Sequence, residues 1–172
     1  MRSLAASSAI LAGVACTTCA LVALAVAAAG QASPARRELA FGFSGPSRHL
    51  GDALDLAVHN GRYVAAVLVA CLAIRWAPTM RWVIDAGLAG LLVLNAALIG
   101  LALGAYGARL VAALAVHGTL ELAAFSLSGG AYLRVRHGAM RRRHFAGAMG
   151  GALGLLALAA VAETWFALGA VR

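Results

Sequence analysis

Apolar side chains dominate the chain in long runs, and few polar residues interrupt these runs. Backbone groups in hydrocarbon must be hydrogen-bonded within their own segment, so apolar runs of roughly 20 residues predict helices that cross about 30 Å of bilayer. The pattern predicts five such helices, near residues 4–29, 60–79, 84–106, 109–133 and 145–170.

The second of these predicted spans is the shortest apolar run. It is bracketed by Arg62 and Arg75, with Trp76 and Trp82 just beyond. Arginine near a helix end can extend its guanidinium to the interface, and tryptophan prefers the depth of the lipid headgroups. We therefore expect residues 60–79 to span the membrane, with Pro78 marking the following turn.

The longest polar stretch lies between the first two predicted spans. Proline, glycine and serine in residues 31–47 predict an irregular link, whereas the mixed apolar and acidic pattern of residues 50–60 predicts a short amphipathic helix at the interface. No stretch is long enough for a soluble domain. The expected architecture is all-α, with residues 1–172 forming one polytopic membrane domain of about five spanning helices plus this interfacial helix.

The composition agrees with a membrane protein. Of 172 residues, 63% are hydrophobic and only 12% are charged, and the mean hydropathy is +0.88. An ordinary soluble domain carries about 25% charged residues, so that class is excluded. Every cation is arginine, a usage typical of bacteria with GC-rich genomes. We therefore expect a multi-pass protein of the bacterial plasma membrane.

The net charge is +8, and about a third of the basic residues lie in one stretch before the last predicted span. Such a stretch normally stays in the cytoplasm and attracts anionic headgroups. It lacks interleaved aromatic residues for base stacking, so we expect no nucleic-acid partner. Arginine placement alone favours four spans, whereas the resemblance described below implies five with a cytoplasmic N-terminus. The arginines concerned are Arg134, Arg136, Arg141, Arg142 and Arg143.

Polar residues within the predicted spans suggest a buried cluster. His117 and Glu121 lie four residues apart and so share one helix face, close enough to pair. Gly118 would allow close backbone contact, and Asn95 and Asn60 on other helices could join the cluster. Three roles remain open: a structural pair, a path for protons or ions, and a contact with a partner's membrane helix.

No complete catalytic or metal-binding set is visible. His117 and Glu121 supply two ligands where zinc needs three or four, and no nucleophile is placed beside an acid and a base. Cys16 and Cys19 form a C-x-x-C motif, but within an apolar run where a reactive thiolate is not expected. We expect neither enzymatic activity nor a cofactor.

Glycines recur at three- and four-residue spacings. Small residues let helix backbones approach closely in lipid, within the chain or between copies of it. The positions expected to pack helices are Gly100, Gly104, Gly129 and Gly130.

Residues 117–133, HGTLELAAFSLSGGAYL, resemble the signature of the stage II sporulation protein M family of bacterial membrane proteins. There, H-G-x-x-E-L is followed by an apolar run ending in A-G-x-x-G-L. Asn60 and the segment from Asn95 to Gly100 resemble two further elements in the same order. Three positions depart from the pattern: Ala123, Ser128 and Tyr132.

This resemblance implies five helices, the second of them spanning, and a non-enzymatic scaffold or recruitment subunit at the cell envelope. Partners implied in this way include cell-wall hydrolases. Other relatives look like membrane components beside ATP-driven export and bacteriocin immunity systems, which gives an alternative in which the His117/Glu121 pair contributes to transport.

Overall fold

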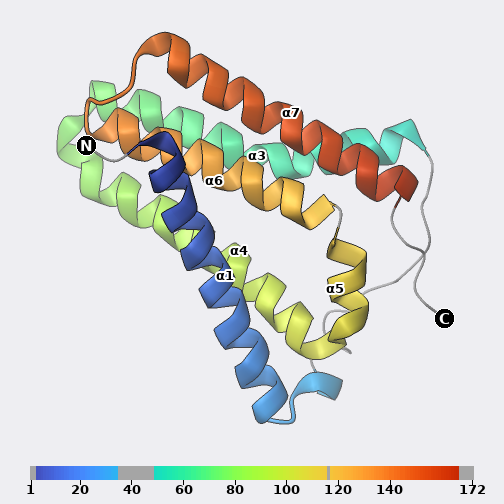
Figure 1. The fold of residues 1–172 in the computed structure, drawn as a ribbon. Helices are drawn as coiled ribbons and strands as arrows, with labels where there is room; N and C mark the ends of the chain where they lie inside the picture. Colours follow the sequence, from blue (N-terminus) through green and yellow to red (C-terminus); the bar gives the residue numbers. More distant parts are fainter. Residues whose placement is uncertain (1–2, 35–48, 116, 167–172) are drawn as a thin grey trace.

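The computed structural model describes residues 3–34, 49–115 and 117–166, which form helices and no strand (Figure 1). The expectation of an all-α chain is therefore confirmed for this part of the molecule. The principal elements are α1 (Leu4–Ala28), α3 (Leu50–Trp76), the 3-10 turn η1 (Pro78–Met80), α4 (Arg81–Tyr106), α5 (Ala108–Leu114), α6 (His117–Arg136) and α7 (Arg142–Phe166).

Several of these helices match the dimensions of a bilayer. Within the described ranges, four are long and apolar enough to span a membrane, namely α1, α3, α4 together with η1, and α7. The pair α5 and α6 forms a fifth candidate, although the two helices are bent by 67°. The described helices therefore suit a membrane-embedded protein with four or five membrane-spanning segments.

Helix α3 corrects one predicted boundary. Residues 50–60 and 60–79 were expected to form separate helices, but α3 runs without a break from Leu50 to Trp76. No proline interrupts this stretch, and a formed helix extends more easily than a new one starts. Helix α3 ends just before Pro78, as expected from the clash of a proline ring with helical backbone. Most of the predicted link at residues 31–47 lies outside the described residues.

The predicted fourth span, residues 109–133, is divided rather than straight. Gly107 adopts φ 57° and ends α4, a conformation that glycine tolerates at little cost. Helix α5 then runs for only seven residues before α6 starts at His117 in a new direction. The change of direction therefore comes before His117, and His117 and Gly118 form the first turn of α6.

Helix α7 begins at Arg142, a turn earlier than the predicted span at 145–170, whose last residues lie outside the described ranges. The arginine-rich stretch is consequently mostly helical. Arg134 and Arg136 occupy the last turn of α6, where positive charge favours the helix dipole, whereas Arg142 and Arg143 begin α7. Arg141 alone among them lies between the two helices.

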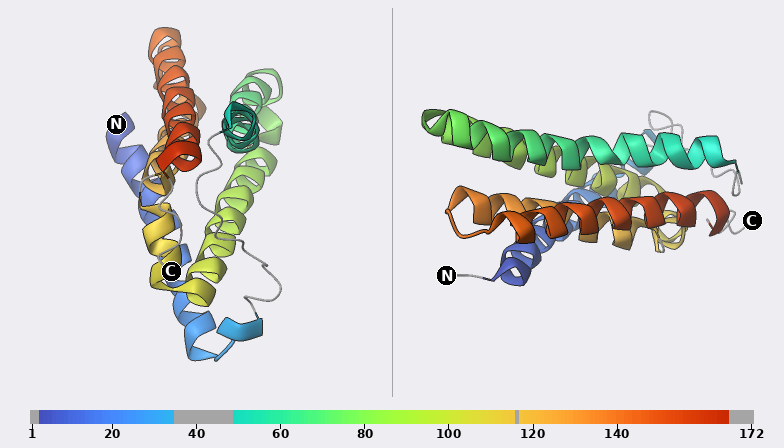
Figure 2. Two further views of the ribbon diagram at one scale, coloured as in Figure 1. Left: turned by 90° about the vertical axis from the view of Figure 1, so that its right-hand side faces the viewer. Right: turned by 90° about the horizontal axis from the view of Figure 1, so that it is seen from above.

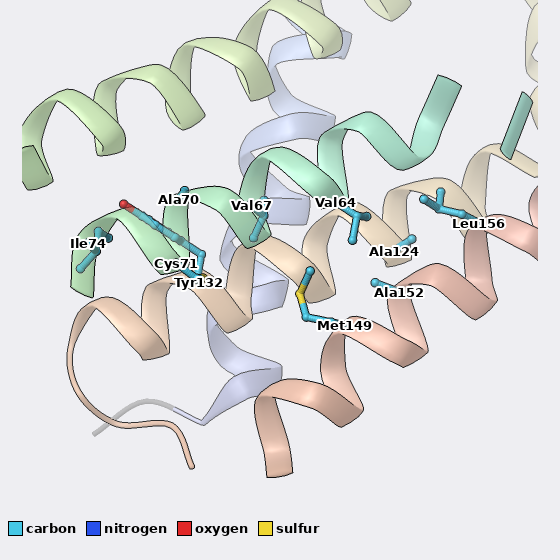
Figure 3. Close-up of a cluster of buried hydrophobic side chains, with 10 residues drawn as sticks. All are labelled: Val64, Val67, Ala70, Cys71, Ile74, Ala124, Tyr132, Met149, Ala152 and Leu156. Carbon is cyan, nitrogen blue, oxygen red and sulfur yellow. The ribbon is translucent and has the colours of Figure 1, made fainter. Parts of the chain in front are cut away.

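Three helices form the main core. Helices α3, α6 and α7 pack along one another (Figure 1), and Figure 2 shows α3 beside α7 and α6 from above. Apolar side chains fill the space between them, including Val67 of α3, Ala124 of α6 and Leu156 of α7 (Figure 3). Tyr132 is buried in the same core, so its large ring is accommodated between the packed helices.

Helix α1 crosses α4 and α6 by a different kind of packing (Figure 1). A Cβ atom at Gly100 would lie 2.5 Å from the Cys19 carbonyl oxygen, and one at Gly104 would lie 2.7 Å from Val26 Cβ. On α6, Gly129 meets Leu11. All four glycines expected to pack helices therefore lie against α1, the fourth being Gly130, which meets Ser8.

Candidate functional site

Polar side chains meet at both ends of the α3, α6 and α7 core. The Glu121 site consists of Asn60, His117, Glu121 and Glu163. The Arg136 site, at the opposite end of α6, consists of Trp82, Asp85, Tyr132 and Arg136.

The Glu121 site joins three helices. The side-chain amide of Asn60 on α3 donates to Glu121 Oε1 on α6. His117, one turn earlier on α6, places Nε2 3.8 Å from Glu163 Oε2 on α7. The His117 side chain is 9% exposed and that of Glu163 is 32% exposed, so the site is more accessible at Glu163 than at His117. One turn deeper, the rings of Tyr63 and Phe125 pack edge to face at 4.9 Å.

This geometry revises the predicted pairing of His117 with Glu121. The two residues share a helix face as expected, but each contacts a different neighbouring helix. The reason is that α3 and α7 supply partners on either side of α6, so both groups can be satisfied across an interface. Gly118 lies beside this pair, and a Cβ there would be 3.2 Å from Leu114 Cβ on α5.

Asn95 does not belong to the site. Its side chain is exposed, and its amide donates to the Leu91 carbonyl one turn earlier on α4 at 2.8 Å. The expected contact between Asn95 and the His117/Glu121 face is therefore wrong, because that part of α4 packs against α1 and not against α6. Asn60, by contrast, reaches Glu121 directly.

The Glu121 site contains more acidic groups than basic groups. It contains two carboxyl groups, which interact electrostatically, beside one amide and one imidazole. Carboxyl and imidazole groups in this arrangement can share and exchange protons. Among the described residues, no three or more His, Cys, Asp or Glu side chains are placed so that they could hold one metal ion.

The Arg136 site is a more complete ion pair. From the sequence, Asp85 and Glu163 were candidates for pairing between helices, but their partners could not be named. The guanidinium contacts both carboxylate oxygens of Asp85: Nε donates to Oδ1 at 2.9 Å and to Oδ2 at 2.7 Å, and Nη2 lies 2.7 Å from Oδ2. The Tyr132 hydroxyl donates to Oδ1 at 2.7 Å. Arg136 also lies over the Trp82 ring at 5.5 Å. Helix α4 is thereby attached to α6, although Asp85 and Arg136 are 51 residues apart.

The cysteines have structural surroundings. Cys19 donates its thiol to the Ala96 carbonyl at 3.0 Å, which links α1 to α4. Cys16 is exposed on α1, and Cys71 is buried in the core. All three are free thiols, so the C-x-x-C pair forms no disulfide here.

Comparison with known proteins adds no relationship to this picture. No family model, curated protein or solved structure matches the chain.

Proposed function

We propose that this chain is a non-enzymatic scaffold or recruitment subunit of the bacterial plasma membrane, of the kind implied by its resemblance to the stage II sporulation protein M family. The observation that carries the proposal is the pairing of polar side chains across helices. Asn60 with Glu121, His117 with Glu163, and Arg136 with Asp85 each join two helices. Polar groups used in this way hold a membrane bundle in one arrangement.

An unoccupied helix face supports recruitment of a partner. Gly147, Gly150 and Gly154 follow one another on α7 at three- and four-residue spacings, and a Cβ at any of them would meet nothing within 4 Å. Small residues at such spacing allow another membrane helix to approach closely. The partner helix of this face would come from another envelope protein or from a second copy of the chain.

The position of α1 supports a cytoplasmic N-terminus. Arg75, Arg81, Arg136 and Arg142 line one cavity at the end of the core where α6 ends and α7 begins (Figure 1), and the exposed rings of Trp76 and Trp82 suit headgroup depth. The first turns of α1 lie toward the same end, since Ser8 contacts Gly130. If this end faces the cytoplasm, α5 and α6 together form one crossing and the chain crosses five times.

One observation favours a second function. The Glu121 site holds two carboxyl groups and an imidazole at the side of the three-helix core, and ionisable groups within membrane helices frequently serve ion or proton movement. In this alternative the chain is a membrane subunit of an ATP-driven export or immunity system.

The first experiment is affinity purification of the tagged full chain from native membranes in mild detergent, followed by mass spectrometry. The scaffold proposal expects cell-wall hydrolases or other envelope proteins to co-purify. It also expects the variant Gly150→Leu/Gly154→Leu to lose these partners. The control variant Gly87→Leu/Gly90→Leu changes two glycines on α4 that also face open space, and it should retain the partners. A stoichiometric ATPase would instead favour the alternative.

A second experiment separates the two functions by changing Glu121. Glutamine keeps an oxygen that can accept from Asn60 but cannot ionise, so a scaffold should retain its partners and abundance in Glu121→Gln. A transport subunit should lose activity in the same variant while it still inserts normally. Loss of activity at normal abundance would therefore contradict the scaffold proposal.

A further inference from the structure

A cavity of about 700 Å³ lies at the arginine-rich end of the core. Its walls come from α3, η1, α4, α6, α7 and the turn between α6 and α7, so it forms only in the folded bundle. Part of the lining is apolar, with Ile74 of α3, Val135 of α6 and Phe145 of α7 among its residues.

Four arginines complete the lining: Arg75, Arg81, Arg136 and Arg142. They belong to four different helices, α3, α4, α6 and α7. Among the described residues, only Arg136 of these four forms a salt bridge, and its partner Asp85 neutralises it. Arg75, Arg81 and Arg142 therefore bring three positive charges to one cavity without a carboxylate to balance them.

This charge arrangement favours an anion in the cavity. Arg75, Arg81 and Arg142 are exposed, so their charges are accessible to a ligand, and Arg142 lies in the first turn of α7, at the positive end of the helix dipole. No acidic residue occurs in that turn. An anion in the cavity would balance these charges, and the forked guanidinium groups suit a phosphate above other anions.

We propose that this cavity binds a phosphate group, carried by the headgroup of an anionic phospholipid whose chains lie along the apolar wall. The position supports a lipid source, because the exposed Trp76 and Trp82 rings nearby mark the depth of the headgroups. The site differs from general attraction of lipid to a basic loop, because only some of the arginines line it. It goes beyond the proposed function and does not depend on it.

The test compares two sets of arginines in the purified full chain. Thermal unfolding in a neutral detergent is followed while phosphatidylglycerol or phosphatidylcholine is titrated in, and native mass spectrometry counts the retained lipid. The cavity variant is Arg75→Gln/Arg81→Gln/Arg142→Gln. The matched control, Arg62→Gln/Arg141→Gln/Arg143→Gln, removes the same charge from positions that do not line the cavity.

Phosphatidylglycerol should stabilise the wild-type chain and the control variant, with one tightly retained lipid per chain. Its affinity should fall about tenfold or more in the cavity variant, as expected for the loss of at least one charge-assisted hydrogen bond. The single variant Arg142→Gln, at an exposed position, should show part of the same loss if the triple variant folds poorly.

Three results would overturn the proposal. Equal losses in the cavity and control variants would mean diffuse surface attraction only. Equal stabilisation by phosphatidylcholine would mean that the anionic charge plays no part. In the third result, inorganic phosphate stabilises the chain through the cavity arginines but phosphatidylglycerol does not. The cavity would then bind phosphate, but a lipid would be excluded as its source.

Discussion

The contacts that hold α1 in the bundle differ in kind from those that hold α3, α6 and α7 to one another. Across the most apolar stretch of α1, 11% of residues are buried, compared with 39% for α7. Helix α1 makes its contacts where glycines of α4 and α6 let backbones touch. Helices α3, α6 and α7 instead interlock larger side chains and are joined by polar pairs. In lipid, where burying apolar surface gains little, close backbone contact and polar pairing are two separate ways of attaching a helix.

The largest expected effect is on the α1 contacts. Gly100→Leu would place side-chain atoms against the Cys19 carbonyl, where even a Cβ comes to 2.5 Å. Because backbone cannot move aside as a flexible side chain can, we expect a loss of about 3 kcal/mol or more in the free energy of unfolding in detergent. Gly90→Leu, on an open face of the same helix, should leave it nearly unchanged. Equal behaviour of the two variants would show that α1 does not depend on close contact.

The next effect concerns the Arg136 site. Asp85→Asn removes the charge that two nitrogens of Arg136 contact, so the apparent Tm in detergent should fall by several degrees. Asp55→Asn changes an exposed carboxylate on α3 and should have little effect. Restored stability in Asp85→Arg/Arg136→Asp would attribute the loss to the ion pair itself. An unchanged Tm in Asp85→Asn would mean that the ion pair does not help to hold α4 against the core.

A smaller effect is expected at the Glu121 site. Glu121→Leu leaves the Asn60 amide without its acceptor and should cost about 1 kcal/mol, the scale of interhelical hydrogen bonds in membranes. Glu121→Gln keeps an acceptor and should cost less. Chemical denaturation of both variants in the same detergent would measure the difference. Greater stability of the leucine variant would mean that the site is retained for function and not for folding.

The smallest effect should follow from Cys19→Ala. It removes the weak thiol hydrogen bond to Ala96 but keeps a small side chain between α1 and α4. We expect a change below about 0.5 kcal/mol in the free energy of unfolding, similar to Cys16→Ala on the exposed face of α1. A loss as large as that of Gly100→Leu would show that polar bonding, and not close packing, holds α1.

The helices were predictable because hydropathy is a local property. The apolar runs indicated α1, α3, α4 and α7, and Pro78 indicated the end of α3. The break before His117 was not predicted, since nothing in the apolar run of residues 109–133 requires it. The four-residue spacing likewise placed His117 and Glu121 on one helix face. It could not show which other helices pack on either side of that face.

Partners on other helices could be predicted only in part. Asn60 was expected near Glu121 and contacts it, whereas Asn95 was expected there and lies elsewhere. Both are amides within apolar helices, so the sequence gives no means of separating them. The packing of the helices separates the two amides. Helix α3 lies beside α6, whereas Asn95 is on an exposed side of α4 that faces away from α6.

Long apolar helices that carry polar groups could be inferred from the amino-acid order, because these properties follow from which residues are neighbours along one helix. The glycines that allow close contact could be inferred in the same way, although not that all four meet α1. The contact of Arg136 with Asp85, the contact of Glu163 with His117 and the arginines from four helices around one cavity became visible only in the folded chain. Those contacts depend on the order and rotation of the packed helices, which arise from the fit of all of them together.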